Sequence, residues 1–168
     1  MDKETQIRLL LNRAYYYLKF RLRAEAEMRL YLHKKAEKFS IPLPIIDEVI
    51  ASLKEEKLIN DDVFAMAFIN DRMRNKPKSH YILKRELQQK GVPDEIIEQQ
   101  LQQVDLPDED LARQALQTAW PRFARLDKEI RYKRVLGYLG RRGFNYGTIK
   151  NLIEEFEGKQ YNRDVTNY

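Results

Sequence analysis

Apolar residues recur along this chain at intervals of three and four, which is the spacing of one face of an α-helix. The clearest case is an internal repeat, because Leu83–Val104 aligns without a gap on Val135–Phe156. In both segments an apolar helix ends at a basic residue and a glycine, and a second apolar helix follows a short turn. Gly91 and Gly143 stand where helices end in the left-handed conformation, which glycine adopts without steric cost. Each segment therefore predicts a helix–turn–helix pair.

A third, degenerate copy lies upstream, with Met28 and Leu32 before its turn and Ile46, Ile50 and Leu53 after it. Each of the three pairs is preceded by a further amphipathic helix. The apolar faces of these three helices carry Ile7, Leu10, Leu11, Ala14 and Leu18, then Phe64, Ala67, Phe68 and Met73, and finally Leu111, Ala115, Ala119 and Phe123. No segment shows the alternation of a β-strand.

The pattern predicts an all-α fold of three tandem three-helix, helix-turn-helix-like repeats, at residues 1–59, 60–106 and 107–157. A unit of about 50 residues buries little apolar surface by itself, so we expect the repeats to stack into an elongated array. The polar tail at residues 158–168 is expected to fray.

Composition narrows the possible chemistry. The 168 residues include no cysteine and only two histidines, His33 and His80. Disulfides, thiolate metal sites and cysteine nucleophiles are therefore excluded, and two imidazoles are too few for a histidine-rich metal site. The polar start Met1–Gln6 lacks the apolar stretch of a signal peptide, and no window reaches the roughly 18 apolar residues that cross a membrane. We expect a cytoplasmic protein with no cofactor, no metal and no membrane partner.

The net charge of +5 is modest, but the charges are unevenly distributed. Seven basic residues and one acidic residue lie between Arg72 and Lys90, and nine basic and two acidic residues lie between Arg113 and Arg142. Such runs either contact phosphate or an acidic partner, or simply solvate a helix face. The candidate partner-binding or nucleic-acid-binding residues are Arg72, Arg74, Lys76, Lys78, Lys84, Arg85, Lys90, Arg131, Lys133, Arg134, Arg141 and Arg142.

Other motifs have structural as well as functional interpretations. Tyr15, Tyr16 and Tyr17 could stack on nucleic-acid bases, although helical spacing turns at least one of them into the core. Trp120 suits packing between helices. The acidic cluster Asp108–Asp110 suits a helix start better than a magnesium-dependent nuclease site, because no base or nucleophile accompanies it. Since the chain also lacks a phosphate-binding loop, the sequence predicts no catalytic residue and no enzyme.

Several motifs together resemble one known family. An acidic turn precedes a Phe-Ala-x-Ala-Phe-type helix in Leu58–Phe68, a basic stretch follows at Asp71–Lys78, and Leu87–Val92 ends the repeat. A second unit carries Arg141–Phe144 followed by Ile149. In order, spacing and repeat number these segments are similar to the RecX family, regulators of the RecA recombinase, over about Leu10 to Phe156. The first repeat departs from the family, because Leu22–Glu25 replaces its usual Ser-x-x-Glu capping box and the turn at Glu37–Pro44 is longer.

The resemblance implies a curved, modular helical protein that lies in the groove of the RecA–DNA filament, and we expect it to be a monomer. It implies inhibition of recombinase, ATPase and coprotease activities, with RecA and the single-stranded DNA of the filament as partners and free DNA as a further one. The alternative is a stand-alone helical DNA-binding protein that acts without a recombinase, because three helices with short turns also build helix-turn-helix modules. Basic residues lie on the middle helices of the last two repeats, which favours an extended partner over a small ligand.

Overall fold

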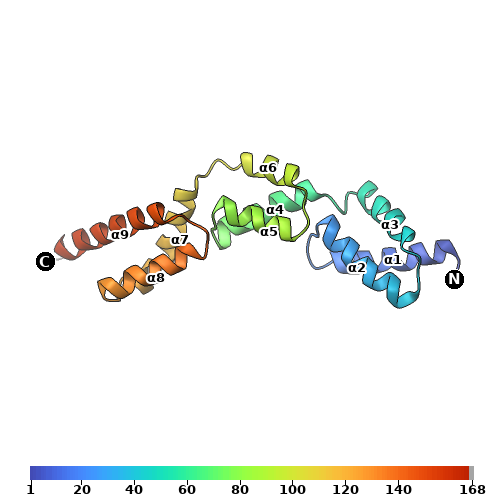
Figure 1. Cartoon of the computed structure of the whole chain (residues 1–168), viewed down its shortest axis with the longest axis horizontal. Coiled ribbons are helices and arrows are strands. Elements are labelled where there is room, and N and C mark those ends of the chain that lie inside the picture. The colour runs from blue at the N-terminus through green and yellow to red at the C-terminus, as the bar shows by residue number, and fades with distance from the viewer. Residues whose placement is uncertain (167–168) are drawn as a thin grey trace. The chain divides into compact units, whose positions relative to one another are not determined.

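The computed structural model describes residues 1–166, with side chains described as far as Lys159. These residues form nine α-helices and no strand, which confirms the predicted all-α fold (Figure 1). The helices are α1 (Lys3–Leu18), α2 (Glu25–Phe39), α3 (Pro44–Glu55), α4 (Asp61–Asn75), α5 (His80–Gln89), α6 (Asp94–Gln102), α7 (Asp108–Phe123), α8 (Lys128–Gly140) and α9 (Tyr146–Thr166).

Contacts divide the chain into two compact units. The first unit holds Met1–Phe68 and Glu86–Leu101, and the second holds Ile69–Arg85 and the chain from Gln102 onward. The boundaries thus fall within α4, within α5 and at the end of α6, and the first two do not lie between the predicted repeats. The division into repeats at residues 1–59, 60–106 and 107–157 stays a prediction.

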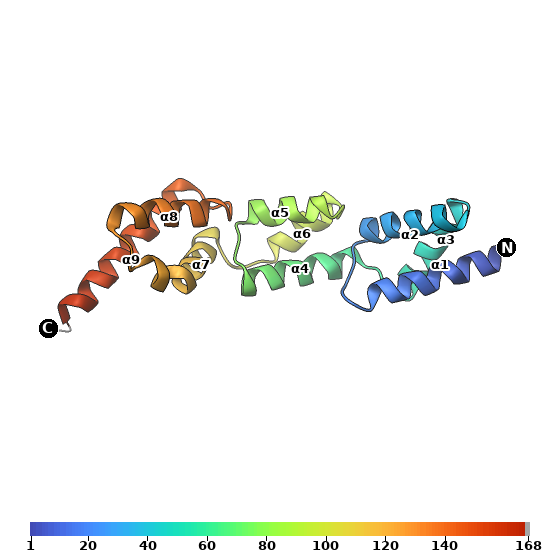
Figure 2. The same ribbon diagram turned by 90° about the horizontal axis from the view of Figure 1, so that it is seen from below.

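In the first unit, α1, α2 and α3 pack against one another in pairs (Figures 1 and 2). The predicted apolar face of α1 is confirmed, because Leu10 and Ala14 are fully buried and Ile7, Leu11 and Leu18 pack at the edge of the same core. The core is completed by Met28, Leu32, Ala36, Ile41, Ile45, Ile46, Val49, Ile50, Leu53 and Ile59. Each fully buried leucine or isoleucine stabilises the fold by about 1.5–3 kcal/mol relative to an exposed one.

In the second unit, α7, α8 and α9 form an equivalent trio (Figure 2). The residues predicted for the apolar face of α7 are all buried, and they pack against Val135 and Leu139 of α8 and against α9. Trp120 packs between helices as predicted, with its ring centroid 5.2 Å from that of Phe156. Aromatic pairs at this distance contribute about 0.5–1.5 kcal/mol beyond their buried area.

Local capping fixes where several helices begin. Asp2 accepts a hydrogen bond from the Thr5 N–H at 2.9 Å, Asn60 one from Val63 at 3.1 Å, and Asn145 one from Thr148 at 2.9 Å. The N-cap of helix α2 is Ala24, which has no side-chain acceptor, so the first turn of α2 lacks this bond. The missing bond costs about 1 kcal/mol relative to a serine cap.

Two glycines end the middle helices α5 and α8 in the left-handed region, with φ of +75° at Gly91 and +85° at Gly143. A Cβ at Gly91 would lie 2.3 Å from the Cβ of Ala26 in α2. A Cβ at Gly143 would lie 2.3 Å from Cγ1 of Ile82 in α5. Glycine is therefore required at each position for two reasons, namely the left-handed backbone conformation and the close approach of a helix from another predicted repeat.

The predicted tail differs from the structure. Helix α9 continues to Thr166, so residues 158–166 are helical rather than frayed, and residues 167–168 lie outside the described residues. An ion pair of 2.6 Å between Lys159 and Glu155, four residues apart, favours the start of this extension.

We predict that Gly143→Ala lowers the free energy of unfolding by about 2–4 kcal/mol, because alanine is strained at this φ and its methyl group overlaps α5. Urea titration followed by circular dichroism measures the effect. Gly140→Ala is the matched control, since its methyl group would meet nothing within 4 Å. We expect the control to be neutral or to stabilise by up to about 1 kcal/mol. Equal losses in both variants would contradict the packing argument.

Candidate partner-binding surface

The structure gathers most of the predicted basic residues in one unit. Eleven of the twelve candidates lie in the second unit, and Lys90 alone lies in the first. The run that begins at Arg72 and the run that ends at Arg142 meet in space, because the N–H of Ser79 donates a 2.9 Å hydrogen bond to the carbonyl of Arg142. The close approach of Gly143 to Ser79 and Ile82 holds the same junction. Two runs about 50 residues apart in the sequence therefore border one another.

An aspartate supplied by the next helix trio caps the helix at this junction. The N–H of His80, the first residue of α5, donates to Oδ1 of Asp108 at 2.8 Å, and the His80 Nδ1 lies 2.6 Å from the same oxygen. His80 thus stands at the start of its helix. The first unit repeats this arrangement, because the N–H of Glu25, the first residue of α2, donates to Oδ1 of Asp61 at 2.8 Å. Burial raises the pKa of Asp61 above its ordinary value.

Sequence reasoning missed these two caps, because donor and acceptor lie 28 and 36 residues apart. A signal was present. Asp61 and Asp108 are the first residues of α4 and α7, the helices that open the second and third predicted repeats. An aspartate at the same place in two repeats suggests a shared contact.

Two candidate arginines form contacts within the second unit. The side chain of Arg131 is only 14% exposed. It donates to Glu157 at 3.2 Å and to the carbonyls of Ala124 and Leu126 at 3.1 and 3.2 Å, so it satisfies the end of α7. Arg142 lies 3.7 Å from the centre of the Tyr138 ring and donates to the Tyr138 carbonyl. Both arginines hold the fold together, which makes them poor partner contacts.

Lys90 has a comparable role in the first unit, where its Nζ lies 3.4 Å from Glu27. Glu27 also accepts from Arg21 at 2.8 Å and from the N–H of Ala24 at 3.3 Å. Burial alone would raise the pKa of Glu27, but the two hydrogen bonds and the charge of Lys90 outweigh it and lower the pKa to about 2. Glu27 thereby supplies the second half of a capping box, the acceptor for the backbone N–H of Ala24, while the half that a serine side chain would supply is missing.

Five further candidates have partners that leave them partly or largely exposed. Lys133 pairs with Glu129 at 2.8 Å, Arg72 with Asp71 at 3.1 Å, and Arg85 lies 5.8 Å from the ring of Tyr81. Lys78 and Lys84 also interact within the chain. Exposed pairs of this kind contribute little to stability and can exchange their partner for an incoming anion.

The remaining four candidates are exposed cations that form no ion pair or hydrogen bond through their side chains with any residue the structure describes. They are Arg74, Lys76, Arg134 and Arg141. Arg134 and Arg141 are seven residues apart and share one face of α8 and its continuation. Gly137 leaves room there for the guanidinium of Arg141, whose Nη1 would lie 3.3 Å from a Cβ at that glycine. These four side chains form the most accessible part of the candidate surface, which we call the second-unit basic surface.

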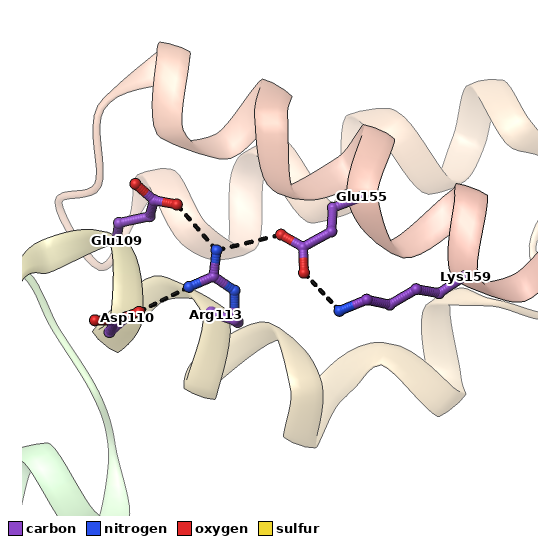
Figure 3. Close-up of polar contacts among 5 residues, drawn as sticks. All are labelled: Glu109, Asp110, Arg113, Glu155 and Lys159. Carbon is purple, nitrogen blue, oxygen red and sulfur yellow. Dashed lines mark hydrogen bonds and ion pairs between the residues drawn. The ribbon is translucent and has the colours of Figure 1, made fainter.

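The acidic cluster at the start of α7 has internal partners. Arg113 donates to Asp110 at 2.7 Å, to Glu109 at 2.9 Å and to Glu155 of α9 at 3.2 Å (Figure 3). Hydrogen bonds from Lys159 and Arg113 lower the pKa of Glu155. Among the side chains that the structure describes, no group of three acidic or histidine residues is placed to hold a metal ion.

No helix within the described part of the chain is both long and apolar enough to cross a membrane.

Two models of one family match the chain. The second three-helix domain of RecX matches residues 60–101, and the third three-helix domain of RecX matches residues 107–153. Together the two matches span more than half of the 168 residues. The chain belongs to the RecX family. The resemblance that the sequence motifs indicated is thereby confirmed.

Relatives of this RecX-family chain include the regulatory proteins RecX of Streptococcus pneumoniae strains ATCC 700669 / Spain 23F-1 and JJA. Each is 43% identical to the chain over 81 residues, which cover 48% of the chain and 30% of the relative. The matched segment thus spans less than a third of these relatives' length. They carry the name of a regulator and not of an enzyme.

Two solved structures share the fold of this RecX-family chain. The crystal structure of RecX from Lactobacillus salivarius has a TM-score of 0.70 and 24% identity, covering 92% of this chain and 98% of that one. A crystal structure of regulatory protein RecX has a TM-score of 0.68 and 20% identity, covering 90% of this chain and 73% of that one. At these identities the likeness concerns the fold alone.

We predict that Asp108→Ala lowers the free energy of unfolding by about 1–2 kcal/mol, because the N–H of His80 loses its acceptor in a half-buried place. The matched control is Asp105→Ala, which removes an exposed aspartate three residues away. We expect this control to change the free energy of unfolding by less than about 0.5 kcal/mol. Thermal unfolding compares the two, and similar stabilities would argue against the cap.

A second prediction concerns the stability of the fold at low pH. The pKa of Glu27 is about 2 in the folded chain and 4.5 ordinarily, so the folded state is stabilised by the charged form. This contribution is complete above about pH 5 and is lost as the pH falls toward about 2. We expect Glu27→Gln to be less stable than the parent by about 1–2 kcal/mol at neutral pH.

The difference in free energy of unfolding between Glu27→Gln and the parent should become smaller as the pH is lowered. Urea titrations at several pH values measure it. Glu37→Gln, on the same helix with a side chain 65% exposed, serves as the control and should show little effect. A gap that stays constant down to about pH 2 would mean that Glu27 is not stabilised as a carboxylate.

Proposed function

We propose that this chain is a regulatory protein that binds the RecA–DNA filament and inhibits its recombinase, ATPase and coprotease activities. Membership of the RecX family supports a regulatory role. The observation that carries the proposal is the second-unit basic surface, where two separate basic runs border one another through Ser79 and Arg142.

The chemistry of this surface suits a large anionic partner. Arg74, Lys76, Arg134 and Arg141 are exposed, and each can pair with a phosphate or with a carboxylate on a protein. A nucleoprotein filament presents both kinds of group. In this proposal the protein acts as a monomer, and its three repeats form an elongated, curved array along the filament groove.

The proposal assigns no catalysis to the chain. Inhibition results from occupation of the filament by a protein that needs neither cofactor nor metal. The partners are RecA and the single-stranded DNA within the filament, and the site of action is the cytoplasm, where the filament forms. Arg131, Arg142 and Lys90 have structural roles, so binding is assigned to the exposed members of the predicted set.

The proposal predicts that replacing Arg74, Lys76, Arg134 and Arg141 together by alanine raises the concentration needed to inhibit a RecA filament by about tenfold or more. The physical reason is the loss of four exposed cations from a charged interface. The measurement is DNA-dependent ATP hydrolysis by RecA at fixed filament concentration, with increasing amounts of the parent or variant chain.

The matched control removes the same charge elsewhere, by replacing Lys3, Lys57, Lys150 and Lys159 by alanine. Each of these lysines is exposed and lies outside the second-unit basic surface. The control should inhibit as the parent does, and circular dichroism should show that both variants keep their helices. Equal inhibition by the four-alanine surface variant and the parent would contradict the proposal. If the parent left ATP hydrolysis unchanged but bound naked duplex tightly, the stand-alone DNA-binding alternative would replace it.

A further inference from the structure

The first unit carries a concentration of positive charge that the basic runs of the second unit do not include. Between Arg8 and Lys38 the chain has nine basic and three acidic residues, an excess of six. The whole chain has an excess of only five. This segment comprises most of α1, the connection to α2 and most of α2. The positive charge is local to this segment, because the first unit as a whole has 13 basic and 15 acidic residues.

Two aromatic rings are exposed among these basic residues. Tyr16 and Phe20 have 62% and 65% of their surface exposed, and their ring centroids lie 5.3 Å apart in an edge-to-face arrangement. They are four residues apart, so they project from the same face of α1 and its end, opposite the buried Leu10 and Ala14. Large exposed rings that pair with one another rather than with the core mark an interaction surface.

Cations flank these rings. Arg13 and Lys19 lie three residues before and after Tyr16, which places them on either side of it on the same helix face. Neither forms an ion pair with any residue the structure describes; Arg13 instead lies 5.7 Å from the centre of the Phe39 ring. A further cation–ring contact extends the pattern, since Arg23 lies 3.7 Å from the centre of the Tyr17 ring.

The neighbouring rings continue this pattern onto α2. Tyr17 stacks on Tyr31 with centroids 4.0 Å apart and planes within 7° of parallel. Lys35 lies 5.1 Å from the centre of the Tyr31 ring. Arg23 and Lys35 are half-buried and rest on rings and not on carboxylates, so no carboxylate neutralises their charge among the described residues. Arg29, by contrast, is neutralised by carboxylates at 2.7 Å.

We propose that Tyr16 and Phe20, with Arg13, Lys19 and Arg23, form a binding face for single-stranded nucleic acid. We call it the aromatic–basic face. Exposed bases stack on Tyr16 and Phe20, and the cations neutralise the adjoining phosphates. Four helical residues rise about 6 Å, which leaves room for neighbouring bases to meet separate rings. The inference does not rest on the recombinase partner proposed above, because it concerns the other unit and a strand free of protein.

Single strands fit this face better than two competing partners. A duplex hides the faces of its bases, so it could use the cations but not the rings. An acidic peptide could also pair with the cations, but the negative face of an aromatic ring repels a carboxylate, whereas it stacks with a base. The combination of exposed rings and unneutralised cations is thus best matched by unpaired bases on a phosphate backbone.

The test measures binding of the full chain, without any recombinase, to a fluorescently labelled thymidine oligonucleotide by anisotropy. The double variant Tyr16→Ala, Phe20→Ala should bind at least about tenfold more weakly than the parent, because each stacked base contributes about fivefold or more. The matched control is Tyr146→Ala, which removes a tyrosine of similar exposure, 59%, from the second unit. It should bind as the parent does, and circular dichroism should show both variants to be folded.

An abasic oligonucleotide of the same length separates stacking from charge. The parent should bind it about tenfold or more weakly than thymidine, and the double variant should bind it no more weakly than the parent does. Equal binding of both oligonucleotides by the parent would overturn the proposal, as would unchanged thymidine binding by the double variant. If a polyglutamate peptide bound more tightly than the oligonucleotide and depended on the same two rings, the face would belong to an acidic protein partner instead.

Discussion

The need of the first N–H groups of the middle helices α2 and α5 for an acceptor is the constraint on which this fold depends. Helices α2 and α5 begin against another repeat, where their first N–H groups need an acceptor. Asp61 and Asp108 supply it, and Gly91 and Gly143 let the end of the following middle helix approach at the same point. A capping bond and a backbone contact thus join one trio of helices to the next at equivalent places.

Whether a feature of this structure could be predicted from the sequence depends on how far apart in the sequence the interacting residues lie. The helices, the buried faces of α1 and α7 and the positive φ of Gly91 and Gly143 depend on neighbours in the sequence, and the repeat made them visible. The bond from Asp108 to His80 depends on packing between repeats, so no local pattern contains it. The helical extension to Thr166 was missed because residues 158–166 are mostly polar, include few strong helix formers and show no apolar periodicity.

The same limit explains why the sequence could not show which of the basic residues are exposed. A charge run indicates where cations are, but only packing determines what each cation contacts. Arg131 closes the end of α7 and Arg142 rests on Tyr138, whereas Arg134 and Arg141 of the same run stay exposed. In α1 and α2 the sequence likewise contains the excess of basic residues, but only packing determines that Tyr16 and Phe20 are exposed among them.

Hydrogen exchange of individual backbone amides tests the central claim most directly, namely that the aspartate caps join successive repeats. If the claim holds, the N–H groups of Glu25 and His80 should be nearly as protected as those in the interior of α2 and α5, although each belongs to the first residue of its helix. Exchange as fast as in the exposed first turn of α1 would contradict it, because the two amides would then be bonded to water and not to Asp61 and Asp108.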